Sequence, residues 1–195
     1  MDDQNTSAGG LRAVTRDMVR RRLSEVAIDL FAEYGFDVVT VEQVAAAAGV
    51  SARSVHRYFP AKEDMVVGEL AAYGDVVRDA LRDRPAEEPV MASLHAAYAA
   101  MLRSRPQTAR DKVAIRLLSS VPSLDARNVQ KHLAWAELLI PLVARRFVGG
   151  DADLRARVLV QSSLSTFTVA LAAWAKEHET RDVHDVLEVA FHALY

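Results

Sequence analysis

The 195-residue sequence predicts an all-α protein of about nine helices. Apolar residues recur at helical spacing along most of the chain, and the alternating runs typical of strands are absent. Capping residues and glycine or proline breaks divide the chain into segments of helical length. About half of the residues, 51%, are apolar, which is enough for a packed core. We expect a small N-terminal module of three helices, fused to a larger helical bundle.

The N-terminal sequence MDDQNTSAGG is acidic and small, and residues 1–10 are expected to form a disordered tail. It lacks the apolar core of a signal peptide, and the chain contains no cysteine, which favours a cytoplasmic protein without disulfides. No uninterrupted apolar run reaches the roughly 18 residues of a membrane span, so no membrane partner is expected. The histidines lack metal-binding spacing, and no motif for a cofactor is present. We therefore predict neither a metal site nor a cofactor.

The first helix is predicted from the apolar residues between Leu23 and Tyr34, which follow the i, i+3, i+4 spacing of one buried face. Gly35 supplies its C-terminal stop. Although the net charge is −2, residues 11–62 contain eight Lys/Arg against six Asp/Glu, an excess of two positive charges. The position of these basic residues therefore matters more than the overall charge.

A second helix opens at Thr40, because Gln43 three residues later completes a capping box. It stops at Gly49, and Ser51 then caps a third helix that ends near Pro60. Two short helices joined by the tight turn AGVS form a helix-turn-helix.

The third helix has the residues that recognition of a DNA major groove requires. Val55 and Phe59 lie four residues apart and can face the first helix. The opposite side carries Ala52, Arg53, His56 and Arg57. Arg53 stands at the second helical position, from which an arginine can reach O6 and N7 of a guanine.

The stretch AIDLFAEYGFDVVTVEQVAAAAGVSARSVHRYFPAKEDM resembles the DNA-binding domain of the TetR (tetracycline-repressor) family. The resemblance implies a DNA-binding domain at residues 11–62 and a ligand-binding and dimerisation domain at residues 63–195. It also implies DNA contacts by residues of the helix-turn-helix and just after it, namely Thr40, Ser51, Ala52, Arg53, His56, Arg57, Tyr58 and Lys62. His56 departs from the aromatic residue that many members carry there, and an imidazole reaches less far.

An arginine-rich arm, LRAVTRDMVRRR, precedes the first helix. Similar arms in this family sometimes enter a minor groove, which is a position that suits arginine. The alternative is a solvated helix start, and the sequence leaves both interpretations open.

Two amphipathic C-terminal helices are expected, one over residues 152–178 and the other ending the chain. Together they suit a four-helix homodimer interface, as the resemblance also implies. The alternative is that they only close the core of the monomer. The small or apolar residues predicted to lie in the interface are Ser163, Thr166, Ala170, Ala173, Val186 and Ala190.

Residues 128–147 are apolar nearly all round, which predicts a central helix, and Pro141 should kink it beside a cavity. The resemblance places an effector pocket in this bundle. Our candidates for its lining are Tyr98, Met101, Arg116, Leu117, Trp135, Leu139 and Phe167, although core packing is an alternative for each. Arg116 either points outward or meets an acidic ligand. Such a lining suits a small apolar or amphipathic effector, for example a fatty acid or an acyl-CoA.

These expectations combine into a homodimeric, ligand-responsive transcriptional regulator that binds a palindromic double-stranded DNA operator, most simply as a repressor. The competing interpretation is an all-α lipid-binding or cofactor-binding protein, or an enzyme, whose helix-turn-helix is vestigial. A third is a helix-turn-helix dimer that serves only protein contacts. The arginines of the third helix distinguish these interpretations.

Overall fold

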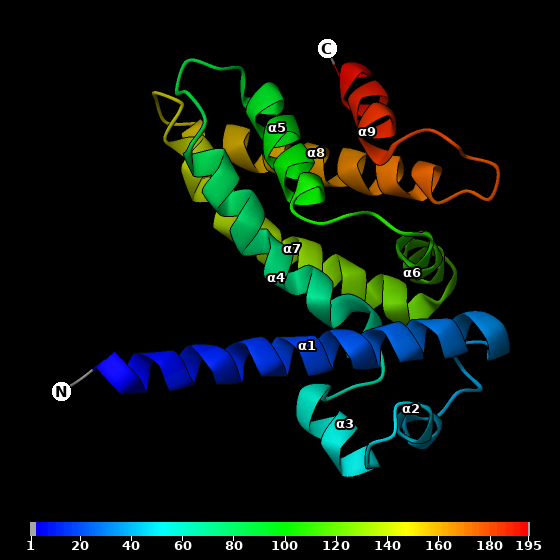
Figure 1. The fold of residues 1–195 in the computed structure, drawn as a ribbon. Helices are drawn as coiled ribbons and strands as arrows, with labels where there is room; N and C mark the ends of the chain where they lie inside the picture. The colour runs from blue at the N-terminus through cyan, green and yellow to red at the C-terminus, as the bar shows by residue number, and fades with distance from the viewer. Residues whose placement is uncertain (1–2, 195) are drawn as a thin grey trace. The chain divides into compact units, whose positions relative to one another are not determined.

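The computed structural model describes the backbone of residues 3–194 and the side chains of residues 14–68 and 70–194. This part of the chain is helical and contains no strand, which confirms the predicted class (Figure 1). The nine helices are α1 (Asp3–Tyr34), α2 (Val41–Ala47), α3 (Ala52–Tyr58), α4 (Asp64–Arg82), α5 (Val90–Arg103), α6 (Ala109–Ser120), α7 (Pro122–Ala144), α8 (Ala152–Trp174) and α9 (Val183–His192).

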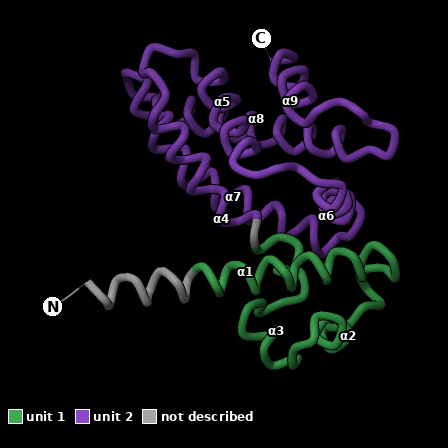
Figure 2. The backbone as a smooth tube through the Cα atoms, viewed as in Figure 1, with its two compact units in different colours: residues 1–69 green, residues 70–195 purple. Residues whose placement is uncertain are grey.

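The chain divides into two compact units, residues 1–69 (unit 1) and residues 70–195 (unit 2), as Figure 2 shows. Helix α4 runs across this division, so the two units share one helix. The division predicted from the sequence, after Lys62, falls just before α4 begins.

Unit 1 is built on α1, whose inner face is formed by Leu23, Ala27 and Phe31. Tyr34, which the spacing also assigned to this face, is 57% exposed, because the helix ends there and turns away at Gly35. The backbone of residues 3–10 continues α1, whereas the sequence predicted a disordered tail for residues 1–10. A packed helix can extend in this way because adding a turn is easier than nucleating one.

The two short helices of unit 1 have the predicted caps. The hydroxyl of Thr40 accepts a hydrogen bond from the amide of Gln43 at 3.3 Å, and the Gln43 side chain accepts one from the amide of Thr40 at 2.8 Å. Ser51 caps α3 by accepting from the amide of Ser54. Gly49 has a φ of +71°, a backbone conformation that suits glycine at the corner of the turn. Local sequence therefore determines the start of both helices.

Unit 2 is a bundle whose core lies between α5, α7, α8 and α9. At its centre the Tyr98 ring stacks on Phe167 with centroids 4.7 Å apart, and its hydroxyl lies 3.0 Å from that of Ser163. This side chain is completely buried, and burial raises the pKa of the phenol well above its usual value. Tyr98 is therefore a neutral, hydrogen-bonded core residue.

Helix α8 is long and apolar enough to cross a membrane by length and composition alone, with a mean hydropathy of 1.2. The bundle explains one side of this composition, because Val160, Leu164 and Phe167 are buried in the core. The opposite side carries further apolar residues that remain exposed.

Candidate DNA-binding surface and effector pocket

Helix α3 is anchored by Val55 and Phe59, which are completely buried, as the sequence predicts. The other side of the helix is open, since Arg53, His56 and Arg57 are all exposed. Ala52 is half-buried. The structure therefore brings the predicted recognition residues to one accessible surface of unit 1.

The arginines of α3 are not neutralised within the described part of the chain. Arg53 has no hydrogen bond or ion pair with a described residue, and the Arg57 guanidinium lies over the Tyr58 ring at 5.2 Å from its centroid. The pKa of Glu42 lies below its usual value. Hydrogen bonds from its own backbone and from the Thr40 side chain are the main causes, and the charge of His56 on α3 makes a smaller contribution. Both guanidinium groups can therefore meet an acidic partner without first breaking an ion pair.

Lys62 has an internal role that the sequence did not reveal. Its ammonium donates to the carbonyl of Phe36 at 2.6 Å and to that of Val39 at 3.1 Å. It also lies 4.3 Å from the centroid of the Phe36 ring. These contacts tie the segment after α3 to the loop between α1 and α2, so the ammonium that was expected to contact a phosphate is already bonded.

We expect Lys62→Met to lower the free energy of unfolding by about 1.5–3 kcal/mol, because it removes two hydrogen bonds from a charged donor while keeping most of the apolar stem. Urea denaturation followed by circular dichroism measures this. Lys176→Met, at an exposed lysine after α8, is the control and should stay within about 0.5 kcal/mol of the parent. Equal behaviour of the two variants would show that Lys62 does not stabilise the fold.

The arginines of the N-terminal arm differ in their surroundings. Arg20 lies over the Phe59 ring at 5.1 Å and belongs to the interior of unit 1. Arg22 forms a surface ion pair with Glu25 at 3.4 Å. Arg16 and Arg21 are exposed, and Arg12 lies outside the described side chains. Arg16, Arg21 and Arg22 are the described arginines of the arm that retain the exposure a DNA contact needs, and of these Arg22 shares its charge with Glu25.

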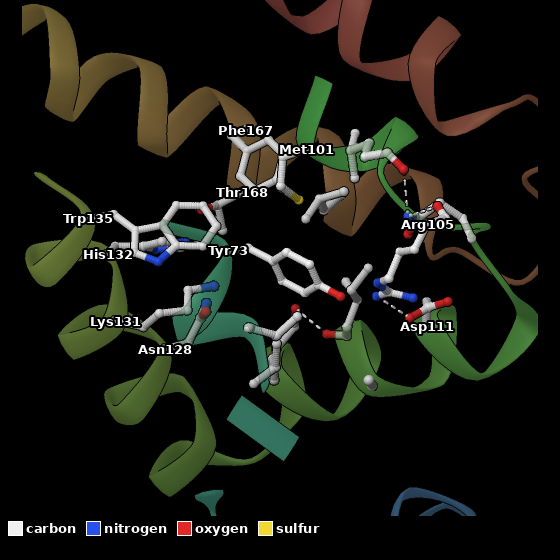
Figure 3. Close-up of a pocket in the computed structure, with 18 residues that line it drawn as sticks. Tyr73, Met101, Arg105, Asp111, Asn128, Lys131, His132, Trp135, Phe167 and Thr168 are labelled. Atoms are coloured by element: carbon white, nitrogen blue, oxygen red, sulfur yellow. Dashed lines mark hydrogen bonds and ion pairs between the residues drawn. The ribbon is translucent and has the colours of Figure 1, made fainter. Parts of the chain in front are cut away.

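A pocket lies in unit 2, among helices α4, α5, α6, α7 and α8, and the space between its walls amounts to about 740 Å³, part of it open to solvent (Figure 3). Its apolar lining is made by Leu70, Met101, Leu102, Ala114, Ile115, Leu118, Trp135, Phe167 and Leu171. Its polar lining is made by Tyr73, Arg105, Gln107, Asp111, Ser119, Asn128, Lys131, His132 and Thr168. The pocket is therefore an apolar cavity with polar groups at defined places, as is usual for small-molecule sites.

One polar group of the pocket is a closed ion pair. Arg105 donates to Asp111 at 2.6 Å, and Asp111 also accepts from the Thr108 amide and hydroxyl. Burial by itself would raise the pKa of Asp111, but the hydrogen bonds from Arg105 and Thr108 hold it below its usual value. Burial likewise opposes the charge of Arg105, whose pKa the bond to Asp111 raises. Both groups are charged and satisfied.

A second set of polar side chains, which belong to Asn128, Lys131 and His132, lies on one face of α7 and forms no ion pair with the described residues of the pocket. Asn128, Lys131 and His132 stand three and four residues apart, and Figure 3 shows them on the same side of the pocket as Trp135. Burial lowers the pKa of Lys131 to about 7, and burial together with the charge of Lys131 lowers the pKa of His132 to about 3. The Asn128 side-chain oxygen and the His132 Nε2 are buried without a hydrogen-bond partner.

Among the residues predicted to line an effector pocket, Met101, Trp135 and Phe167 line the pocket found in unit 2. Tyr98 and Leu139 are buried in the bundle core, and Leu117 does not reach the pocket. Arg116 is exposed and donates to the carbonyl of Ala175 at 2.8 Å, so it points outward. The pocket residues of α7, at 128–135, precede Pro141, which is exposed, so the proline does not form the cavity.

Sequence reasoning missed the polar residues of the pocket, of which Lys131 is the most informative. A signal was available, because Lys131 shares a helical face with Asn128 and Trp135 in a largely apolar segment. A lysine on a buried face requires an explanation, whereas an isolated arginine such as Arg116 can reach solvent.

Trp135 joins the pocket to α4. Its indole N–H donates to the carbonyl of Ala71 at 3.2 Å. Gly74, one turn further along α4, leaves room for the indole: a Cβ at this position would lie 2.6 Å from Cδ1 of Trp135. The residue that lines the pocket is thus also the residue against which α4 packs.

The residues predicted for a dimer interface mostly face inward. Ser163, Ala170 and Val186 are buried in the subunit itself, and Ser163 donates to the carbonyl of Val160. Ala173 and Ala190 pack against the same core, and Thr166 is half-buried. The placement of Ser163, Ala170 and Val186 in an interface is therefore wrong, because these residues complete the core between α5, α8 and α9.

Comparison with known proteins identifies both parts of the chain. Residues 23–67 match the profile of bacterial regulatory proteins of the tetR family, and residues 85–195 match the profile of the MftR C-terminal domain. The chain is 30% identical to the HTH-type transcriptional regulator TcmR of Streptomyces glaucescens, over 93% of this chain and 83% of TcmR.

Another regulator and one solved structure are similar to this chain along most of its length. MftR of Mycobacterium tuberculosis, named as a regulator of mycofactocin biosynthesis, is 29% identical over 90% of this chain and 89% of MftR. The crystal structure of Thermus thermophilus FadR in complex with lauroyl-CoA has a TM-score of 0.53 and 24% identity, over 90% of this chain and 92% of that one. The solved structure supports the fold.

Proposed function

Because this chain belongs to the TetR family of bacterial regulatory proteins, and is therefore a DNA-binding transcriptional regulator and not an enzyme, we propose that it is a ligand-responsive repressor. It would bind a palindromic operator as a homodimer in the cytoplasm and be released by a small apolar or amphipathic effector. The observation that carries this proposal is the open arginine surface of α3.

The DNA contacts would be made by the exposed side of α3 and by the caps of α2 and α3. Arg53 and Arg57 are free to pair with guanine or phosphate, since no described carboxylate holds them. Thr40 and Ser51 are exposed at helix starts, where a phosphate is favoured by the helix dipole. His56 and Tyr58 flank this surface.

The homodimer would form through the exposed side of α8. Leu154, Val158 and Val169 lie on one stripe of this helix at i, i+4 and i+15, and each is more than half exposed. Val189 on α9 is exposed to a similar degree. Gln161, Ser162 and Ser165 lie exposed between Val158 and Val169 on the same side, so this surface has apolar ends and a polar middle. Exposed apolar residues gathered on one side of a helix favour a protein interface, and a twofold dimer reads two half-sites of an operator.

The effector would act through Trp135. A ligand in the pocket contacts Trp135, and Trp135 packs on Ala71 and Gly74 of α4. Because α4 continues into unit 1, a shift of α4 would change the spacing of the two recognition helices in the dimer and reduce affinity for the operator. FadR of Thermus thermophilus, which was crystallised with lauroyl-CoA, is a member of the family whose ligand is amphipathic.

The test is the variant Arg53→Ala. An operator is first selected from genomic fragments with the parent protein, and affinities are then measured at one fixed salt concentration. Loss of one base contact should weaken operator binding by about 1–3 kcal/mol, that is, about 5-fold to 150-fold, while binding to nonspecific DNA changes little. Arg103→Ala, an exposed arginine on α5, is the matched control. Unchanged operator affinity of Arg53→Ala would contradict the proposed surface.

A further inference from the structure

We propose that the pocket in unit 2 selects a ligand whose apolar body carries a single carboxylate and that Lys131 pairs with this carboxylate. The inference rests on the proposed effector pocket and gives its ligand a chemical class. It assigns to Lys131 the specificity that the sequence had suggested for Arg116, which points out of the bundle.

The first support is the isolation of the Lys131 ammonium. The residue is only 8% exposed, and it has no hydrogen bond or ion pair with a described residue. Its one contact of note is with the ring of Trp135, 5.0 Å from the centroid. A buried cation without a partner is unfavourable, and an anion brought into the pocket would remove that penalty.

The second support is that no group of the pocket can neutralise Lys131 from within. Asp111 is the acidic residue of the lining, and it is held by Arg105 and Thr108. Asn128 and His132 add two buried polar atoms without partners beside Lys131. Lys131 is the charged member of this polar group on α7, and an anionic head group in the pocket would pair with it.

The third support is the contrast between this polar group on α7 and the rest of the cavity. Trp135, Phe167 and Leu171 offer the apolar body of a ligand a dry surface. A neutral head group would leave the ammonium unpaired, and a cationic one would meet like charge. One unpaired cation matches one negative charge, which favours a monoanion over a phosphate ester with two charges.

Proton uptake follows from the charges around the pocket. The titratable and charged groups that line it are Tyr73 on α4, Arg105 in the loop after α5, Asp111 on α6 and Lys131 and His132 on α7, while α8 contributes only Phe167, Thr168 and Leu171. Arg105 and Asp111 keep their charges, and His132, with a pKa near 3, is neutral at pH 6–8.

Lys131, with a pKa of about 7 in the empty pocket, is mostly neutral at pH 8 and mostly charged at pH 6. A bound carboxylate favours the ammonium and raises its pKa. Binding at pH 8 should therefore take up a proton, and binding at pH 6 should take up little. The affinity for the anion should fall by up to about tenfold per pH unit above pH 7.

The experiment compares decanoate with 1-decanol, which share a chain and differ in the charge of the head group. Titration calorimetry on the full-length protein, in two buffers of different ionisation enthalpy at pH 6 and pH 8, gives affinities and proton counts. We expect decanoate to bind at least about tenfold more tightly than decanol, with proton uptake at pH 8 only. Lys131→Met should abolish both the preference and the uptake. Lys112→Met, whose ammonium bonds the Glu179 carbonyl outside the pocket, should retain both.

The parent protein alone can overturn the inference, whether or not Lys131→Met folds. Equal affinity for decanoate and decanol, no binding of decanoate at millimolar concentration, or no proton uptake at pH 8 would each do so. Release of operator DNA is measured in parallel. Equal release by both compounds would overturn this inference and leave the proposed function in place. Anion-selective binding that leaves operator affinity unchanged would support this inference and contradict the proposed function.

Discussion

The variant carrying Val158→Asp and Val169→Asp is expected to sediment as a monomer at concentrations where the parent is a dimer. Both valines are exposed on α8, by 56% and 63%, on the side opposite the bundle core. In a twofold dimer the two substitutions introduce four carboxylates into one apolar interface. Each buried valine contributes about 1.5 kcal/mol or more, and each unpaired buried charge opposes association further. The dissociation constant should rise by more than about 100-fold.

The same variant should lose most of its operator affinity, because a monomer reads only one half-site. Val148→Asp provides the matched control, since Val148 is 98% exposed but lies in the loop that follows α7. It should leave both the sedimentation coefficient and operator binding unchanged. A double variant that remains dimeric would place the interface elsewhere than on the exposed stripe of α8.

The position of this stripe shows what helical periodicity can and cannot predict. Apolar spacing predicts a helix over residues 152–178, and the structure has one that ends four residues earlier, at Trp174, but α8 is apolar on two sides. One side, with Val160 and Phe167, is buried in the subunit, and the other, with Val158 and Val169, is not. Ser163 and Ala170 lie with the buried side, where they allow close approach of α5. Which side meets the rest of its own chain depends on tertiary packing, which periodicity does not contain.

The candidate DNA-binding surface could be predicted further than the pocket, because its geometry is local. The caps at Thr40 and Ser51 and the four-residue spacing of Val55 and Phe59 determine which side of α3 faces outward. Lys62 was assigned a different role because its partners lie 23 and 26 residues earlier in the chain.

The pocket depends on five helices at once. The Arg105–Asp111 ion pair joins the loop after α5 to α6. Lys131 can be recognised as an unpaired cation only once the structure shows that no acidic side chain of the pocket lies beside it. Met101, Trp135 and Phe167 were among the candidates, whereas Arg105, in the loop after α5, gives no local signal. The signal of Lys131 lies only in the buried face that it shares with Asn128 and Trp135.

Trp135→Ala is expected to lower the free energy of unfolding by about 3–5 kcal/mol, as is usual when a buried tryptophan is truncated. The indole is buried between α4 and the pocket, so its removal opens a cavity at the place where the two meet. The variant also loses the hydrogen bond from the indole to the carbonyl of Ala71. Chemical denaturation followed by circular dichroism measures the loss without relying on tryptophan fluorescence.

The partner substitution Gly74→Ala should have opposite effects in the two backgrounds. In the parent, the new methyl group would lie 2.6 Å from Cδ1 and 2.8 Å from Nε1 of Trp135, and this overpacking should cost about 1–3 kcal/mol. In the Trp135→Ala background the clash with the indole is gone, and the remaining close neighbour is Cδ1 of Leu138 at 3.3 Å, the end of a side chain that can shift slightly. The same change should therefore stabilise α4 by up to about 1 kcal/mol through the better helix propensity of alanine. The double-mutant cycle should therefore yield a coupling free energy of about 1.5 kcal/mol or more.

Gly68→Ala on the same helix is the matched control, because the nearest atom to its new methyl group would be Nη2 of Arg20 and not Trp135. Whatever its sign, its effect should be the same in both backgrounds. If the effect of Gly74→Ala on stability were also the same with and without Trp135, a displacement of the indole by a ligand would not move α4. If the two positions are coupled, a ligand that pushes the indole toward Gly74 creates the same overlap as the added methyl group. It must then either move α4 or bind more weakly by a similar free energy. That is the physical condition for a bound effector to act on the DNA-binding unit.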